Sequence, residues 1–364
     1  GWFFFFNVMG CSEIYTMGVA LIPSLQTAEN LPFVNENPWK FLCFLIFWAI
    51  NIAVVWGGID SIQFLEKWSA PFLLFIGVAL LAWAYMTAEG FGQILSAPSK
   101  LTDSGEFMKV FATGLTANVA FWATLSLNIP DFTRFARSQR DQVLGQAIGL
   151  PPTMTAFAFI GVAVTSATVV IYGTPIWDPI ELLGRIGEGR PFIIFFSMFA
   201  FAVATLTTNI AANVVSPAND FAHLAPKHIS FRLGGLITGL IGILMCPWYL
   251  LARPDAYIFT WLSGYGSLLG AIGGVLLVEY WIIERRELEL VDLYREGGRY
   301  PTWRPSAVAA FFLGTLPCIP GFLQTVGVLE APAFFQTIYD YSVFVSAGTA
   351  AVIHFVSSRH RRRP

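Results

Sequence analysis

The dominant pattern along the chain is a series of long apolar segments separated by short polar ones. Ten segments are long enough to cross a bilayer, which takes about 20 predominantly apolar residues in a helix. We therefore expect an all-α polytopic membrane protein with ten spans. The expected spans are Gly1–Pro23, Phe41–Gly57, Trp68–Ala88, Met108–Ile129, Gly145–Tyr172, Pro191–Val215, Leu233–Leu251, Tyr257–Ile283, Ser306–Val326 and Phe335–Val356.

Composition agrees with this pattern. Apolar residues make up 55% of the 364 residues and charged residues 12%, which is typical of a polytopic membrane protein. The net charge of −2 gives no reason to expect nucleic acid as a partner. No loop is long enough to bury a core of its own, so we expect residues 1–364 to form a single membrane domain.

The sequence shows no enzyme signature. It contains no nucleophile elbow, Walker loop, metal-ligand cluster or pair of catalytic carboxylates at useful spacing. The Gly-rich segment SGYGSLLGAIGG (Ser263–Gly274) follows no strand, so it indicates close helix packing or a flexible gate rather than a phosphate loop. We expect neither an enzymatic activity nor a cofactor.

The distribution of basic residues predicts the orientation. Fifteen of the 21 lysines and arginines fall in alternate loops and in the C-terminal tail. The positive-inside rule then places the tail in the cytoplasm, with the chain in the cell membrane. Residue 1 is Gly, and the first span has no polar lead, so we expect the chain to be the C-terminal part of a longer protein.

Polar residues interrupt the span from Gly114 to Phe135. Asn118 and Trp122 lie at mid-span, where hydrocarbon penalises a polar group that finds no partner. Trp122 is about twelve residues from either end, so it fits an interfacial belt poorly and suits stacking on a planar ring. Asp131 and Arg134, about one turn apart at the expected cytoplasmic end, predict a local ion pair.

The sixth span carries two polar stripes. Ala204, Thr207 and Thr208 fall on one stripe, whose carbonyl and hydroxyl oxygens suit a small hard cation such as Na⁺. A second stripe holds Asn209, Asn213 and Ser216, and carboxamides suit a solute with amide edges. The alternative is that these groups bond across helices as packing contacts, which we favour for Thr205. For Asn213 we favour a role in solute binding, because Asn is costly among alanines in a membrane.

Glu13 is the acidic residue well inside the first span. An ionisable group at this depth is a hypothesis for function by default. A neutral, hydrogen-bonded carboxyl with a structural role explains the residue equally well.

Three segments together resemble one known family. They are FWATLSLNIPDFTRFARSQRDQVLGQAIGLPPTM (Phe121–Met154), TLTTNIAANVVSPANDFAHLAPKHISFRLGGLITG (Thr205–Gly239) and LVDLYREGGRY (Leu290–Tyr300). They resemble the nucleobase:cation symporter-1 family, which comprises permeases for cytosine, uracil, thiamine, allantoin, hydantoins and related compounds. The likeness extends over nearly the whole chain and is strongest to the bacterial allantoin/uracil permease branch.

The resemblance implies an inverted-repeat transporter fold with five helices in each repeat and two additional helices. On this alignment the chain lacks the first two helices of the fold. Residues 1–88 are then the remainder of the first repeat, and residues 107–284 form the second. Residues 306–357 are the two additional helices, and residues 358–364 are a basic cytoplasmic tail.

The resemblance also implies roles for single residues. Trp2 and Trp122 would stack on the two faces of the substrate ring, and Asn213 would bond to its amide edge. Phe121 and Asn118 flank Trp122, and Phe6 stands where the family usually has a glutamine that contacts substrate. Trp122 would lie in a broken helix. The expected half-site for Na⁺ comprises Ala204, through its carbonyl, with Thr207 and Thr208.

We therefore expect a secondary active transporter that imports a nucleobase or a related ureide or hydantoin by cation symport and alternating access. Na⁺ or H⁺ is the coupling ion, and Glu13 is the candidate if protons are used. Expected partners are a small heterocyclic substrate and membrane lipid, with neither nucleic acid nor an obligate protein partner. The alternatives are an amino-acid permease of the same architecture and, in another class, a channel.

Overall fold

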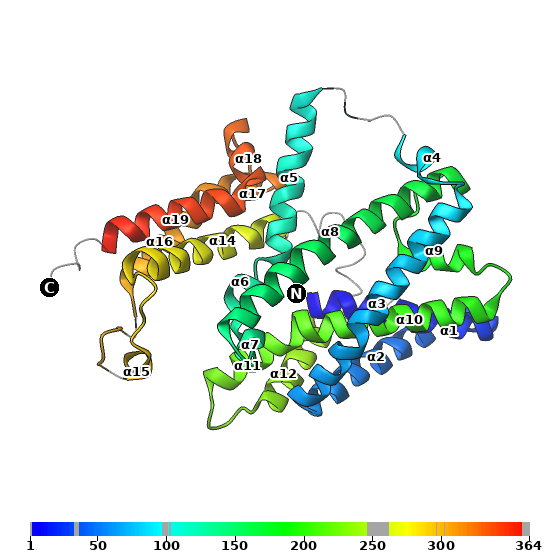
Figure 1. Cartoon of the computed structure of the whole chain (residues 1–364), viewed down its shortest axis with the longest axis horizontal. Helices are drawn as coiled ribbons and strands as arrows, with labels where there is room; N and C mark the ends of the chain where they lie inside the picture. The colour runs from blue at the N-terminus through cyan, green and yellow to red at the C-terminus, as the bar shows by residue number, and fades with distance from the viewer. Residues whose placement is uncertain are drawn as a thin grey trace. The chain divides into compact units, whose positions relative to one another are not determined.

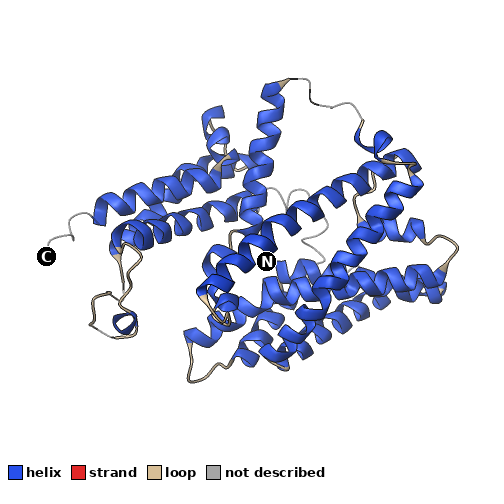
Figure 2. Ribbon diagram, viewed as in Figure 1, coloured by secondary structure: helices blue, strands red, loops and turns tan. Residues whose placement is uncertain are grey.

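The computed structural model describes residues 2–32, 36–96, 101, 103–245, 262–295, 297–301 and 303–358. These residues form helices and connecting loops, without strands (Figure 2). The longer helices are α1 (Trp2–Leu21), α2 (Pro38–Trp56), α3 (Ile59–Thr87), α5 (Ser104–Trp122), α8 (Gln139–Tyr172), α10 (Pro191–Asn209), α11 (Val215–Leu224), α12 (Phe231–Leu244), α14 (Leu262–Val278), α16 (Pro305–Thr315) and α19 (Ser342–Ser358). The shorter ones are α4 (Phe91–Leu95), α6 (Leu125–Asn128), α7 (Pro130–Thr133), α9 (Pro179–Ile186), α15 (Leu290–Leu293), α17 (Ile319–Thr325) and α18 (Ala333–Asp340).

Several helices have the length and composition of membrane spans. Six helical runs in the described residues qualify, and a seventh results if α18 and α19, bent by 87°, count as one span. The six runs are Pro38–Trp56, Ile59–Thr87, Gln139–Tyr172, Pro191–Leu224, Leu262–Ile283 and Pro305–Thr325. The expectation of an all-α polytopic membrane protein is therefore confirmed. The other expected spans fall on α1, α5 and α12, so the count of ten and the two absent helices stay predictions.

The chain divides into two compact units. The first comprises Gly1–Pro98 and Asp131–Ala252, and the second comprises Ser99–Pro130 and Arg253–Pro364. Each unit thus combines segments that are far apart in the sequence. The expected division into repeats follows sequence order instead, and it stays a prediction.

In the first unit, α1 packs along α10 and α2 (Figure 1). Its apolar cluster consists of Phe3, Val55, Ile62, Ile210, Val214 and Val215, all of them buried. Gly234 brings α12 close to α11, because a β-carbon there would collide with the backbone of Ala218. The Trp48 indole of α2 also donates a hydrogen bond to the Gly239 carbonyl of α12, at 2.9 Å.

In the second unit, α14 packs against α19, α16 and α5 (Figure 1). Gly270 and Gly274 of α14 lie directly on the backbone of α19, at Val343 and Ala347. The Gly-rich segment therefore serves close helix packing, one of the two roles expected for it.

The helix expected to end at Val215 continues to Leu224. A π-helical turn at Ile210–Val214 joins α10 to α11. Pro217 lies in the first turn of α11 and has no N–H for the carbonyl one turn earlier, that of Asn213. A local change of helical pitch is one way in which a helix accommodates such a break, so this proline does not end the span.

Candidate functional site

The π turn is the central feature of the candidate site in the first unit. The Val215 N–H bonds to the carbonyl of Ile210, which closes the wider i→i+5 turn. Such turns within α-helices are frequent at functional sites. This turn carries Asn213, the predicted amide contact, and it follows directly on Asn209.

Asn213 is the end of a chain of three carboxamides. Its Nδ2 donates to Oδ1 of Asn209 at 3.0 Å, and Nδ2 of Asn209 donates to Oδ1 of Asn51 at 3.0 Å. Asn51, on α2, in turn donates to the carbonyl of Phe47 at 2.8 Å. Asn51 and Asn209 are fully buried, while Asn213 is half-buried. This row of hydrogen-bonded amides therefore connects Asn213, the predicted solute contact, to the interior of the first unit.

Sequence analysis did not identify Asn51 as part of this arrangement. The signal was present, because a carboxamide in the apolar stretch FLIFWAINIAVV is costly in a membrane without a partner. Its partner Asn209 is 158 positions away, so no local spacing reveals the pair.

The predicted cation ligands lie five to nine residues before Asn213. The Thr207 hydroxyl donates to the carbonyl of Ala204 at 2.9 Å, and the Thr207 side chain is buried. The Thr207 hydroxyl and the Ala204 carbonyl, two of the predicted ligands, are therefore in contact. Thr208 is exposed, and its hydroxyl has no hydrogen-bond partner in the part of the chain that the structure describes.

Glu13 and Thr205 connect α1 to α10. Glu13 is fully buried, and its Oε1 accepts a hydrogen bond of 2.6 Å from the Thr205 hydroxyl. The cross-helix role favoured for Thr205 is therefore confirmed. Oε2 of Glu13 is also buried and has no hydrogen-bond partner among the described residues.

The two other predicted residues of α1 lie near its beginning. Trp2 is the first residue of the helix, and its side chain lies outside the described residues. Phe6 is half-buried, with its ring edge-on to Phe5 at 5.8 Å between centroids.

The second unit holds the remaining predicted substrate residues at the end of α5. The helix ends at Trp122, where the resemblance implies a break, and the short α6 follows after two residues. Trp122 is 36% exposed and lies edge-on to Phe121, with ring centroids 5.2 Å apart. Asn118 is exposed and donates to the carbonyl of Gly114 at 2.9 Å. The structure thus brings Trp122 and Phe121 together, whereas the sandwich with Trp2 stays a prediction.

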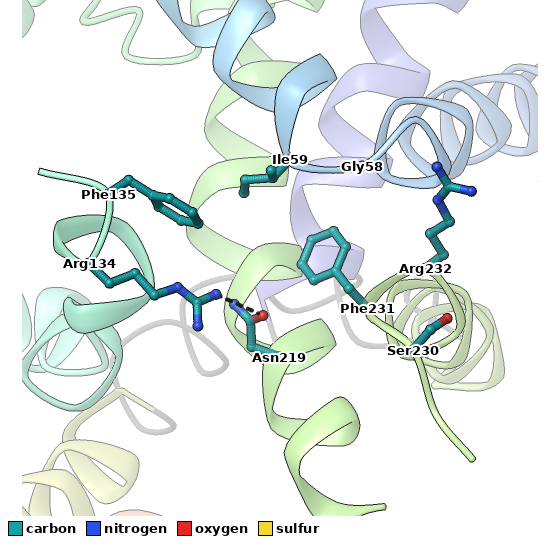
Figure 3. A pocket seen from close by; sticks show the side chains of 8 residues that line it. All are labelled: Gly58, Ile59, Arg134, Phe135, Asn219, Ser230, Phe231 and Arg232. Atoms are coloured by element: carbon teal, nitrogen blue, oxygen red, sulfur yellow. Dashed lines mark hydrogen bonds between the residues drawn. The ribbon is translucent and has the colours of Figure 1, made fainter. Parts of the chain in front are cut away.

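The first unit also contains a cavity of about 570 Å³ that sequence analysis did not identify (Figure 3). It is lined by Gly58, Ile59, Arg134, Phe135, Asn219, Ser230, Phe231 and Arg232. The Arg134 guanidinium donates to Oδ1 of Asn219 at 3.1 Å and lies 3.9 Å from the carboxylate of Asp131. The local ion pair predicted for Asp131 and Arg134 is therefore confirmed.

The structure has long apolar helices. One of them widens into a π turn beside buried amides, and another ends at a partly exposed tryptophan. These are the features of a helical membrane transporter fold. Residues 1–346 match the family described as permeases for cytosine/purines, uracil, thiamine and allantoin. The chain belongs to this family, as the resemblance implied.

The chain is also similar in sequence to individual permeases. The chain is 43% identical over 362 residues to the purine-uracil permease NCS1 of Arabidopsis thaliana, covering 98% of the chain and 60% of that protein. It is 39% identical over 321 residues to the allantoin permease of Bacillus subtilis, covering 87% of the chain and 63% of that permease. The chain thus spans about three fifths of the length of these relatives. Because a plant and a bacterial permease are both similar, the expected bacterial branch stays a prediction.

A solved structure shows the same fold. Mhp1, a nucleobase-cation-symport-1 family transporter, in a closed conformation with bromovinylhydantoin bound, superposes with a TM-score of 0.70. Its sequence is 23% identical, and the match covers 99% of this chain and 73% of that one. At this level of identity the likeness supports the fold.

Proposed function

We propose that the protein is a secondary active transporter that imports a nucleobase or a related ureide or hydantoin together with a cation. The observation that carries the proposal is the position of Asn213, which ends a chain of buried amides on a π turn of a membrane-spanning helix. Membrane permeases of the same family, named for uracil, purines and allantoin, are consistent with such a solute.

The chemistry of the proposed substrate contacts suits a flat ring with amide edges. Asn213 offers both an acceptor and a donor, and Trp122 offers a partly exposed π face next to Phe121. In this proposal Trp2, Phe6 and Asn118 complete the site. Phe6 contributes no hydrogen bond, so Asn213 carries more of the recognition than it would beside a glutamine.

For the cation we propose Na⁺ at the oxygens of Ala204, Thr207 and Thr208. The buried contact between the Thr207 hydroxyl and the Ala204 carbonyl supports this choice, because two oxygen ligands are already together. Glu13 is the alternative for proton coupling, and its hydrogen bond to Thr205 fits a structural carboxyl as well. In both cases the C-terminal tail is expected in the cytoplasm.

Competition of unlabelled solutes with radiolabelled uptake in cells tests the proposal. The gene is expressed at full length, and uracil, allantoin, hydantoin, cytosine and leucine compete in turn. We expect at least one of the four heterocycles to compete and leucine to have no effect. Competition by leucine alone would favour an amino-acid permease, and uptake that does not saturate would favour a channel.

A further inference from the structure

The three carboxamides near the π turn all donate in the same direction. Nδ2 of Asn213 donates to Asn209, Nδ2 of Asn209 donates to Asn51, and Nδ2 of Asn51 donates to the carbonyl of Phe47. A carboxamide has a donor end and an acceptor end, so each member of such a chain determines how the next one is turned.

The Phe47 carbonyl determines the direction of the whole chain. A backbone carbonyl only accepts, so Asn51 must turn its NH₂ group toward it and its Oδ1 toward Asn209. Asn209 must then donate to Asn51 and accept from Asn213. This hydrogen-bond network therefore assigns the amide orientation at Asn213, which the shape of the group alone does not.

Burial makes the reverse direction unfavourable. The side chains of Asn51 and Asn209 are inaccessible to water, since both residues are 0% exposed. Ile210 and Val214 belong to the buried apolar cluster of the first unit and lie in the same π turn as Asn213. Turning one amide round would place NH₂ against NH₂ in a dry interior, where unsatisfied donors are costly.

Asn213 consequently presents its carbonyl oxygen to a solute. Its Oδ1 accepts no hydrogen bond within the described part of the chain, and one N–H of its amide is used on Asn209. If the substrate ring keeps its position, the ring nitrogen that faces Oδ1 must carry a hydrogen in order to donate a hydrogen bond to it. Uracil, hydantoin and allantoin each have a ring N–H between two carbonyl groups, whereas the corresponding ring nitrogen of cytosine carries no hydrogen and is an acceptor.

We propose that Asn51 is a positioning residue that fixes the amide orientation of Asn213 and thereby selects rings with an N–H between two carbonyl groups over cytosine. The inference rests on the proposed function, because it takes Asn213 as the solute contact. Asn51 itself touches no solute in this scheme and acts through Asn209.

The test measures a selectivity ratio, the inhibition constant of cytosine divided by that of uracil, for uptake by the full-length protein. Asn51→Leu removes the amide that the Phe47 carbonyl orients. The side-chain amides of Asn209 and Asn213 can then turn round together. We expect the ratio to fall by about tenfold, with the maximal rate per transporter at the cell surface little changed. A merely structural role for Asn51 would lower surface amount or rate and leave the ratio as it was.

Two further variants make the test specific. Asn51→Asp keeps an acceptor for Asn209, so it should retain the ratio of the wild type. Thr238→Val is the matched control, because it removes a buried hydrogen bond of 2.9 Å from a side chain to its own helix, on α12, outside the amide chain. If Asn51→Leu does not reach the membrane, Asn51→Ala replaces it, since a water in the vacated space can donate or accept and so fixes no direction.

The outcomes separate this inference from the proposed function. If none of the heterocycles competes in the wild type, the proposed function fails and the inference falls with it. If the wild type takes up uracil but prefers cytosine, the inference alone is overturned. The same holds if the ratio is unchanged in Asn51→Leu or Asn51→Ala. A ratio that falls in the Leu or Ala variant and is retained in Asn51→Asp and Thr238→Val supports it.

Discussion

The Thr205 hydroxyl donates a hydrogen bond of 2.6 Å to Oε1 of Glu13, joining two helices at residues 192 positions apart. Both side chains are buried, and Glu13 is fully so. The contact gives the carboxyl a partner in the interior of the first unit, where an unpaired polar group is costly.

Thr205→Val should therefore destabilise the protein. The substitution keeps the shape of the side chain and leaves both oxygens of Glu13 without a partner among the described residues, at a cost of about 1–3 kcal/mol. A lower melting temperature of the purified full-length protein would show this. Thr155→Val is the control, because that exposed hydroxyl bonds only to its own helix, and it should leave the melting temperature unchanged.

A second cluster holds the helices of the second unit together. Glu279 pairs through one oxygen with Arg304 and through the other with Nε2 of the fully buried His354, at 2.8 Å. We expect Glu279→Gln to lower the free energy of unfolding by roughly 1–2 kcal/mol, since it weakens two charge-assisted contacts. Chemical denaturation of the purified protein measures this value.

The control for that variant is Glu181→Gln. It breaks the exposed ion pair with Arg185, where both side chains are about half accessible and water replaces the contact. An equal loss in the two variants would show that the Glu279 cluster contributes no more than a surface pair.

Trp122→Ala should weaken substrate affinity about ten- to hundredfold, because the loss of ring stacking costs about 1–3 kcal/mol. Trp122→Phe should lose less, since it retains a π face. The inhibition constant of the best competing heterocycle measures both. Trp177→Ala is the matched control, because Trp177 is 75% exposed and lies outside the proposed site. Unchanged affinity in Trp122→Ala would show that this ring has a packing role only.

Cation coupling is tested by substrate binding with and without Na⁺ at constant ionic strength. A bound Na⁺ at Ala204 and Thr207 would rigidify the helix that presents Asn213, so cation and substrate affinities should rise together. We expect Na⁺ to increase substrate affinity in the wild type and to have a smaller effect in Thr207→Ala and Thr208→Ala. If choline serves as well as Na⁺ in the wild type, the sodium site is wrong. A pH dependence that disappears in Glu13→Gln would then favour proton coupling.

The sequence predicted those features that depend on neighbours along one helix. The spacing of Asn209 and Asn213 placed them on one stripe, and they do form a hydrogen bond. The ion pair of Asp131 and Arg134 has the same local origin. Contacts that depend on which helices pack together were not predictable in this way. Asn51 meets Asn209 across 158 positions, and His354 meets Glu279 across 75.

The sequence did not predict the π turn, for a different reason. Apolar periodicity is a property of several turns, so a single wider turn at Ile210–Val214 changes it very little. The span was expected to end at Val215, whereas the helix continues to Leu224. Packing of Ile210, Val214 and Val215 in the apolar cluster outweighs the hydrogen bond that Pro217 cannot make.

The most direct measurement of the central claim compares heterocycle binding by the purified full-length wild type with that of Asn213→Ala and Asn213→Asp. We expect both variants to lose affinity by about tenfold or more, because Ala removes the acceptor that meets the solute N–H, and an ionised Asp cannot donate the hydrogen bond to Asn209 that orients this group. Thr238→Val is the control, because it removes a buried side-chain hydrogen bond on α12, outside the proposed site. Binding by Asn213→Ala with the affinity of the wild type would contradict the account.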